Sequence, residues 1–411
     1  SGSLCGRFAG GYEGHGTHVT GILAGDGKMS NGFFKGIAPK SDIVSLKVLD
    51  KRGIGKEDNV ISGIWWIIDN GKKYNIKVVN ISFGTFNKEG NNKKLIEAVE
   101  LLWDMGYVII AAAGNNGPEY GTVSIPGSSK RIITVGALDD NIKMIVNGRI
   151  TKNYSGRGPT KECVQKPDIL APANGIYSCS NGMKSGYSYV PKSGTSMATP
   201  FVTGSAALMM EWGIVKQNAP YLYGERLKYF LVVSANRSRT DITYPDPTWG
   251  YGEVCLSSAI EKVIENIGFM MNRRSNDMYG LIDRLEQNEN QDEEEVIGIL
   301  VEYNSLEELK KINELPGASV AILDTNYAVV FIPYNRISEI KPYIKDIVSS
   351  EVQAIYTLEE TSPVDASGAT LFHNNPYLQL NGRGVIVGIV DTGIDYLNKE
   401  FMNEDDTTRI L

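Results

Sequence analysis

The chain has 411 residues, 42% of them hydrophobic, and its 41 basic and 48 acidic side chains give a net charge of −7. This balance predicts a soluble globular protein, and the lack of any Lys/Arg-rich block argues against nucleic acid and membrane surfaces as partners. No apolar run approaches the ~20 residues of a membrane-spanning helix. Four cysteines without a CxxC pair form no disulfide framework. The length favours one large domain and one smaller one.

Between residues 14 and 265, apolar β-rich runs alternate with helical patterns. The expected elements, in chain order, are a strand at Ile43–Val48, a helix at Asp58–Asn70, a strand at Val78–Ser82, a helix at Lys94–Met105, strands at Val108–Ala113 and Ile132–Val135, and a helix at Met197–Trp212. Such alternation is typical of an α/β domain, in which helices flank a parallel sheet.

The pattern changes after residue 265. A charged stretch without periodicity at residues 272–295 predicts a linker, assigned to 266–295. A smaller unit follows, with a strand at Val296–Tyr303, a helix opened by Ser305 with Glu308 as a capping box, strands at Ser319–Leu323 and Tyr327–Ile332, a helix near Ile337–Ile344 and a strand at Val352–Thr357. The order βαββαβ predicts a split-βαβ, ferredoxin-like α+β sandwich. A buried-type strand at Gly384–Val390 then ends at Asp391.

Four residues are candidates for chemistry, and each also has an ordinary structural explanation. His15 lies between glycines at the start of an apolar helical run, which suits a catalytic base or a structural histidine. Ser196 begins a helix after a turn of small residues, as a nucleophile or a simple cap would. Asp391 ends a buried strand, where α/β sheets bind ligands, and Asn115 follows another strand, as an oxyanion donor or a turn residue.

Taken together, the motifs resemble those of the subtilisin-like serine proteases, or subtilases. They are VDTGID (Val390–Asp395), GHGTHVTGI (Gly14–Ile22), NISFG (Asn80–Gly84), AAAGNNG (Ala111–Gly117) and GTSMATP (Gly194–Pro200). The resemblance implies a serine endopeptidase with Ser196 as nucleophile, His15 as general base and Asp391 orienting the imidazole. It further implies that Asn115 donates to the oxyanion and that His18 packs beneath the site. Substrate would bind along Ser82, Phe83, Gly84, Ala112, Ala113 and Gly114.

Relative to that family, the order of the motifs is rotated, because Asp391 follows Ser196 instead of preceding His15. We divide the chain into a catalytic part at 1–265, the linker, a pro-domain at 296–360 and an Asp-bearing catalytic part at 361–411. The family keeps an inhibitory pro-domain just before its Asp motif, bound in its own cleft, and self-cleavage is expected within Tyr356–Thr370. Circular permutation, a window cut from two tandem subtilases, and pieces of a processed enzyme joined out of order all account for the rotation, and a single complete domain is favoured.

Finer details, among them SGRGPT (Ser155–Thr160) and YPDPTWGYGEVCL (Tyr244–Leu256), resemble clostridial germination proteases of the Csp type. This implies activation of another protease or zymogen in spore germination, in a spore-associated or cytoplasmic setting. The alternatives are a silent scaffold or sensor blocked by its pro-domain, and a tandem fragment. No cofactor is required. Many subtilases hold a structural calcium in the loop matching Gly25–Lys35. The only side-chain candidates here are Asp26, Ser30 and Asn31, so a calcium ion is possible there but is not supported by the sequence.

Overall fold

The computed structural model describes residues 14–50, 52–85, 93–146, 149–181, 188–266, 296–303, 305–322, 327–333, 339–343, 346–347, 369–373, 378–403, 405 and 407–411. The chain divides into two compact units, Ser1–Ile267 with Thr361–Thr370 and Leu380–Leu411, and Gly268–Glu360 with Leu371–Gln379. The predicted linker apart from residue 266, the strand at Val352–Thr357 and nearly all of the predicted cleavage region lie outside the described residues.

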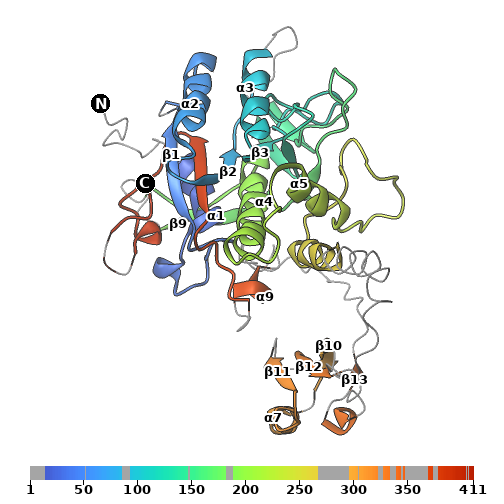
Figure 1. Cartoon of the computed structure of the whole chain (residues 1–411). Coiled ribbons are helices and arrows are strands. Elements are labelled where there is room, and N and C mark those ends of the chain that lie inside the picture. Colours follow the sequence, from blue (N-terminus) through green and yellow to red (C-terminus); the bar gives the residue numbers. More distant parts are fainter. Residues whose placement is uncertain are drawn as a thin grey trace, which may run out of the picture. The chain divides into compact units, whose positions relative to one another are not determined.

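The first unit is built on a six-stranded parallel sheet in the order β1-β14-β2-β3-β4-β7 (Figure 1). Its strands are β1 (Asp42–Lys47), β14 (Ile386–Asp391), β2 (Ile76–Ile81), β3 (Val108–Ala112), β4 (Ile133–Ala137) and β7 (Ile169–Ala171). The inner strands are nearly continuous runs of buried Ile, Val and Ala, as expected where helices cover both faces of a parallel sheet. The predicted α/β class is therefore confirmed.

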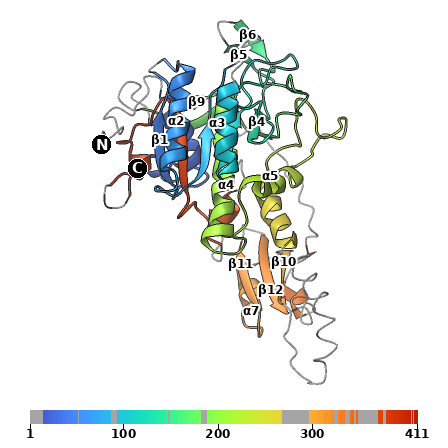
Figure 2. The ribbon, with the colours of Figure 1, turned by 45° about the horizontal axis from the view of Figure 1, so that its top comes forward.

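Two helix pairs flank this sheet. Helix α1 (His15–Ala24) packs against α4 (Thr195–Met210), and α2 (Glu57–Asn70) packs against α3 (Lys93–Asp104), the pair that stands side by side in Figure 2. Helix α4 also contacts β2, β3, β4 and β7, so it lies along the middle of the sheet. It begins two residues before its predicted start and passes into a π-helical turn at Glu211–Val215. Helix α5 covers Gly224–Val233, and a further helix covers residues 256–266.

The C-terminal segment completes the first unit. Strand β14 inserts between β1 and β2, with Val387 opposite Ile43 on one side and Val78 on the other. Beyond it, a short 3₁₀ turn (Lys399–Phe401) leads to Ile410, which pairs with Ile43 at the outer edge of β1. Small hairpins are formed by β5 (Lys143–Val146) with β6 (Arg149–Lys152) and by β8 (Ile176–Cys179) with β9 (Tyr189–Lys192).

The second unit carries a four-stranded antiparallel sheet in the order β11-β12-β10-β13. Its elements are β10 (Val296–Glu302), α7 (Leu306–Ile312), β11 (Ser319–Ile322), β12 (Tyr327–Pro333), a 3₁₀ turn (Lys341–Tyr343) and β13 (Asp346–Ile347). The predicted Ser305 cap is present, since its hydroxyl accepts the Glu308 N–H at 3.2 Å. Strand β13 pairs with β10, but it lies earlier in the sequence than the predicted fourth strand. In the region of the predicted second helix, the described residues form a 3₁₀ turn. A core around Tyr303, Leu309, Ile312, Val330 and Ile340 is buried within this unit.

Across the described parts of both units, we find no helix of the length and apolar character needed to cross a bilayer.

Candidate active site

The His15 imidazole and the Asp391 carboxylate form a hydrogen-bonded pair from opposite ends of the chain. His15 Nδ1 lies 2.8 Å from Asp391 Oδ1 and 3.1 Å from Oδ2. Asp391 is the last residue of β14 and is fully buried, whereas His15 opens α1 and keeps 26% of its side chain exposed. When the Nδ1–H donates to the buried carboxylate, Nε2 is the ring nitrogen left to accept a proton.

The turn after Asp391 holds this carboxylate in place. The Thr392 N–H donates to Asp391 Oδ1 at 2.6 Å, and the Thr392 hydroxyl accepts the Gly16 N–H at 3.0 Å. The Lys47 ammonium, at the end of β1, donates to the Thr392 carbonyl. A Cβ atom at position 16 would collide with the Gly393 carbonyl, so the close approach of α1 to this turn requires glycine there.

Ser196 is the second residue of α4 and is half-buried. It follows Gly194, whose φ of 140° lies in a region that favours glycine. Among the described residues, neither the Ser196 hydroxyl nor its backbone N–H has a hydrogen-bond partner, and no bond joins Ser196 to His15. The free N–H at a helix N-terminus is a donor suited to a developing negative charge.

Asn115 lies against the same helix end. Its Oδ1 accepts both the Thr195 N–H at 3.0 Å and the Thr195 hydroxyl at 3.1 Å. The Thr195 hydroxyl also accepts the Gly114 N–H at 3.1 Å. Because the Asn115 side-chain oxygen is occupied by Thr195, its NH₂ group remains available to donate a hydrogen bond to an oxyanion. A Cβ atom at Gly194 would come within 3.3 Å of that nitrogen, so glycine keeps the space beside it open.

The residues predicted to bind substrate differ in exposure. Phe83 is half-buried and Gly84 is exposed, whereas Ser82 is buried and its hydroxyl accepts from Asn80. On the other side, Gly114 is half-buried and has a φ of 87°. Ala112 and Ala113 are buried in and just after β3, where the backbone of Ala113 is already paired with Val135 and Ser124. The accessible groups are therefore Phe83, Gly84 and Gly114.

Ser124 lies beside these segments but belongs to none of the sequence motifs. A Cβ atom at either Gly84 or Gly114 would collide with Ser124, whose hydroxyl accepts from Asn116 Nδ2 at 2.9 Å. Ser124 thus packs tightly against both glycine segments. In the sequence, only the glycines at positions 84 and 114 indicated such a neighbour, because a glycine often marks a place where another group packs closely against the backbone.

His18 lies one turn after His15 and is fully buried. Its Nε2 lies 3.0 Å from the Ile176 carbonyl and 2.9 Å from the Val190 carbonyl, so the ring donates from Nε2 and is neutral. Burial, with repulsion from Lys192 as a second cause, lowers the pKa of His18 to about 3. The side chain joins α1 to the β8–β9 hairpin, as expected for a packing residue beneath the site.

Two of the three candidate calcium ligands, Asp26 and Ser30, are engaged by protein groups. Asp26 Oδ1 accepts the Lys28 N–H at 3.0 Å, and Ser30 donates to the Gly27 carbonyl and accepts the Phe34 N–H. Asn31 makes no side-chain hydrogen bond among the described residues, and a φ of 51° places it in a left-handed turn. Calcium requires six to eight converging oxygens. The described residues contain no acidic, His or Cys cluster able to hold a metal ion, and this loop does not fit one.

A model of the subtilase family, peptidase S8, matches residues 6–252, well over half of the chain. The chain belongs to the subtilase family. The match includes His15, Asn115 and Ser196, while Asp391 lies beyond it.

Among its relatives, this subtilase is 38% identical to the serine protease AprX of Bacillus subtilis over 216 residues, which cover 48% of this chain and 49% of AprX. It is 36% identical to a subtilisin of Bacillus sp. strain TA39 over 201 residues, covering 47% and 46% of the two chains. The chain thus spans about half the length of these relatives. The structure of the Clostridium perfringens CspB protease matches 62% of this chain and 80% of its own, with 24% identity and a TM-score of 0.54, which supports the fold.

Proposed function

We propose that this subtilase is a serine endopeptidase that hydrolyses peptide bonds through Ser196, His15 and Asp391. The observation that carries the proposal is the His15–Asp391 hydrogen bond, formed where β14 lies between β1 and β2. That pairing supports a triad within one chain despite the rotated order of motifs. It also favours the single complete domain over the tandem-fragment alternative.

The mechanism follows from the free groups of the site. Ser196 Oγ attacks the scissile carbonyl while His15 Nε2 takes its proton, and Asp391 stabilises the imidazolium that results. The negative charge on the tetrahedral oxygen is met by the Asn115 NH₂ and the Ser196 N–H, neither of which has a partner among the described residues. His15 then protonates the leaving amine, and water attacks the acyl-enzyme by the reverse sequence to release the acid.

The substrate class is an extended peptide. Gly84 is exposed and makes no backbone hydrogen bond among the described residues, which suits strand addition by a substrate. Both backbone groups of Gly114 are already paired, with the Thr195 hydroxyl and the Gly156 N–H. We further propose that residues 296–360 are a pro-domain that binds at this substrate site and is released by self-cleavage. The pro-domain assignment is supported by the antiparallel α+β unit and by its place before Asp391 in the sequence. Activation of another protease in germination is the role suggested by the sequence resemblance to Csp-type enzymes.

Labelling with a fluorophosphonate, read by intact mass, tests the triad. We expect one adduct on the parent chain, none on Ser196→Ala and strongly slowed labelling of His15→Ala and Asp391→Ala. Ser205→Ala is the matched control, because Ser205 lies on the same helix, is fully buried, and its hydroxyl has no hydrogen-bond partner among the described residues. A folded parent that stays unlabelled refutes the working protease and favours the blocked scaffold. Labelling that survives in Ser196→Ala refutes the assignment of the nucleophile.

A further inference from the structure

Helix α1, which carries His15, is held at both ends by the segment that carries Asp391. At its start, the Thr17 hydroxyl accepts the Asp395 N–H at 2.9 Å, next to the Gly16–Thr392 bond. At its end, Arg409 Nη2 donates to the Ala24 carbonyl at 2.7 Å. The relative position of the two catalytic side chains therefore depends on how this segment is fixed at both places.

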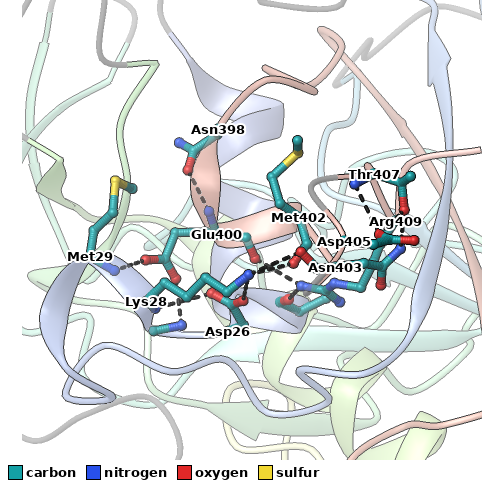
Figure 3. A network of polar contacts seen from close by, with 12 residues as sticks. Asp26, Lys28, Met29, Asn398, Glu400, Met402, Asn403, Asp405, Thr407 and Arg409 are labelled. Carbon is teal, nitrogen blue, oxygen red and sulfur yellow. Dashed lines mark hydrogen bonds and ion pairs between the residues drawn. The ribbon is translucent and has the colours of Figure 1, made fainter.

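The second place centres on Glu400, which is fully buried (Figure 3). Its Oε2 accepts the Gly27 N–H at 2.5 Å, its Oε1 accepts the Met29 N–H at 2.7 Å, and the Tyr189 hydroxyl donates to Oε1 as well. A buried carboxylate is costly unless such donors meet it. Burial raises the pKa of Glu400, while these donors act in the opposite direction.

Further hydrogen bonds join the segment around Glu400 to the loop at residues 24–30. The Glu400 carbonyl accepts the Asp26 N–H at 3.1 Å and Arg409 Nη2 at 2.8 Å. A third group is the Lys28 ammonium, which donates to the Met402 carbonyl at 2.9 Å and lies 3.4 Å from Asp26 Oδ2 (Figure 3). A side-chain cation thus lies among the carbonyl and carboxylate oxygens of this loop, which are the kind of atoms that calcium would need as ligands.

We propose that the loop at residues 24–30 is locked onto the Asp391 segment by protein groups alone, with Glu400 as the positioning residue and no calcium. Each Glu400 oxygen already faces a donor, and Asp26 faces the N–H and ammonium of Lys28. Calcium could bind only by displacing these bonds. The attachment of this loop does not depend on activity, whereas its effect on activity rests on the serine-protease function proposed above.

The calcium part is tested on the full chain carrying Ser196→Ala, which removes self-cleavage. We expect the melting temperature to be the same in excess EDTA and in millimolar calcium chloride. We also expect slow hydrogen exchange at the Gly27 and Met29 amides in both conditions. A rise of several degrees with calcium that disappears in Glu400→Gln would place the ion on Glu400 and overturn the proposal.

The positioning part is tested by Glu400→Gln with the active serine present. Glutamine keeps the shape but supplies one acceptor oxygen, so one of the two amide bonds is lost. We expect faster exchange in this loop and about a tenfold lower kcat with KM unchanged, because a misplaced dyad slows chemistry without weakening substrate binding. Glu100→Gln is the matched control, since Glu100 accepts a single hydroxyl from Ser129 at 2.7 Å on helix α3.

The outcomes separate the two proposals. If the parent chain is not labelled by fluorophosphonate, the proposed function fails. The melting temperatures with and without calcium and the hydrogen exchange of the loop still test whether protein groups alone hold the loop at residues 24–30. If the parent is labelled and Glu400→Gln retains full kcat, Glu400 is not a positioning residue. If Glu400→Gln loses activity only through KM, or no more than Glu100→Gln does, that role is likewise refuted.

Discussion

Protonation of His18 should make the first unit acid-sensitive. The folded protein holds the ring neutral with a pKa of about 3, whereas the unfolded chain has the ordinary value near 6.5. Between these values the unfolded state binds the extra proton, so the free energy of unfolding falls as pH falls from 6.5 toward 3. At 1.36 kcal/mol per pH unit, this group contributes a loss of about 2 kcal/mol between pH 7 and pH 5. No discount for solvent screening applies, because the side chain is fully buried.

The assay is urea unfolding at pH 7, 6 and 5 in the Ser196→Ala background, with and without His18→Gln. Glutamine can donate to the Ile176 and Val190 carbonyls but does not titrate. We expect His18→Gln to be less stable than its parent at pH 7. Between pH 7 and pH 5, the parent should lose about 2 kcal/mol more of its free energy of unfolding than the variant does. The His18 C2–H resonance should also keep its neutral shift down to pH 5. Parallel stability curves for the two proteins, or a His18 resonance that titrates near pH 6.5, would refute the reasoning.

Three further predictions concern single side chains. Asn115→Ala should lower kcat by about 10²–10³ with little change in KM, measured on a peptide substrate, because it removes one oxyanion donor; an unchanged kcat would exclude that role. Asp391→Asn should lower kcat by about 10⁴ while the melting temperature stays within a few degrees, since the neutral amide no longer fixes the Nδ1–H tautomer; near-normal turnover would contradict this. Lys166→Met should cost about 3–5 kcal/mol in urea unfolding, because the fully buried ammonium donates to Asp168 at 2.5 Å and its loss leaves that carboxylate short of a partner. Lys228→Met, whose ammonium is partly exposed and 3.0 Å from Asp168, should cost less, and equal losses would argue against the burial effect.

The sheet and its main helices could be predicted from the sequence because hydrophobic periodicity reports burial directly. Strand β3, predicted at Val108–Ala113, is an unbroken apolar run between turns, and α2 shows the amphipathic pattern of a surface helix. The beginning of α4 was less visible, because Gly194, Thr195 and Ser196 carry no apolar periodicity. That helix start is set by the Asn115–Thr195 bonds, which join residues 80 positions apart.

The polar contacts that fix the site could not be found in this way. The pairing of His15 with Asp391 spans 376 positions, and family motifs suggested it where no local pattern could. Glu400 lies in a short polar stretch that resembles many surface turns, yet it is fully buried. Its role depends on backbone N–H groups of Gly27 and Met29, and backbone donors leave no mark in a sequence. The proposed calcium-free contact between residues 24–30 and the Asp391 segment rests on the same kind of bond.

The position of β14 connects the fold to the proposed chemistry. This strand is the second in the sheet, and β1 and β2 have no direct pairing with each other, so the sheet is continuous only when β14 lies between them. Asp391 is therefore buried beside His15 by the same pairing that completes the sheet. The Thr392 and Glu400 contacts then fix the two ends of α1 against that strand. Because the pairing that completes the sheet also places Asp391 beside His15, the rotated order of the motifs does not prevent these two side chains from meeting.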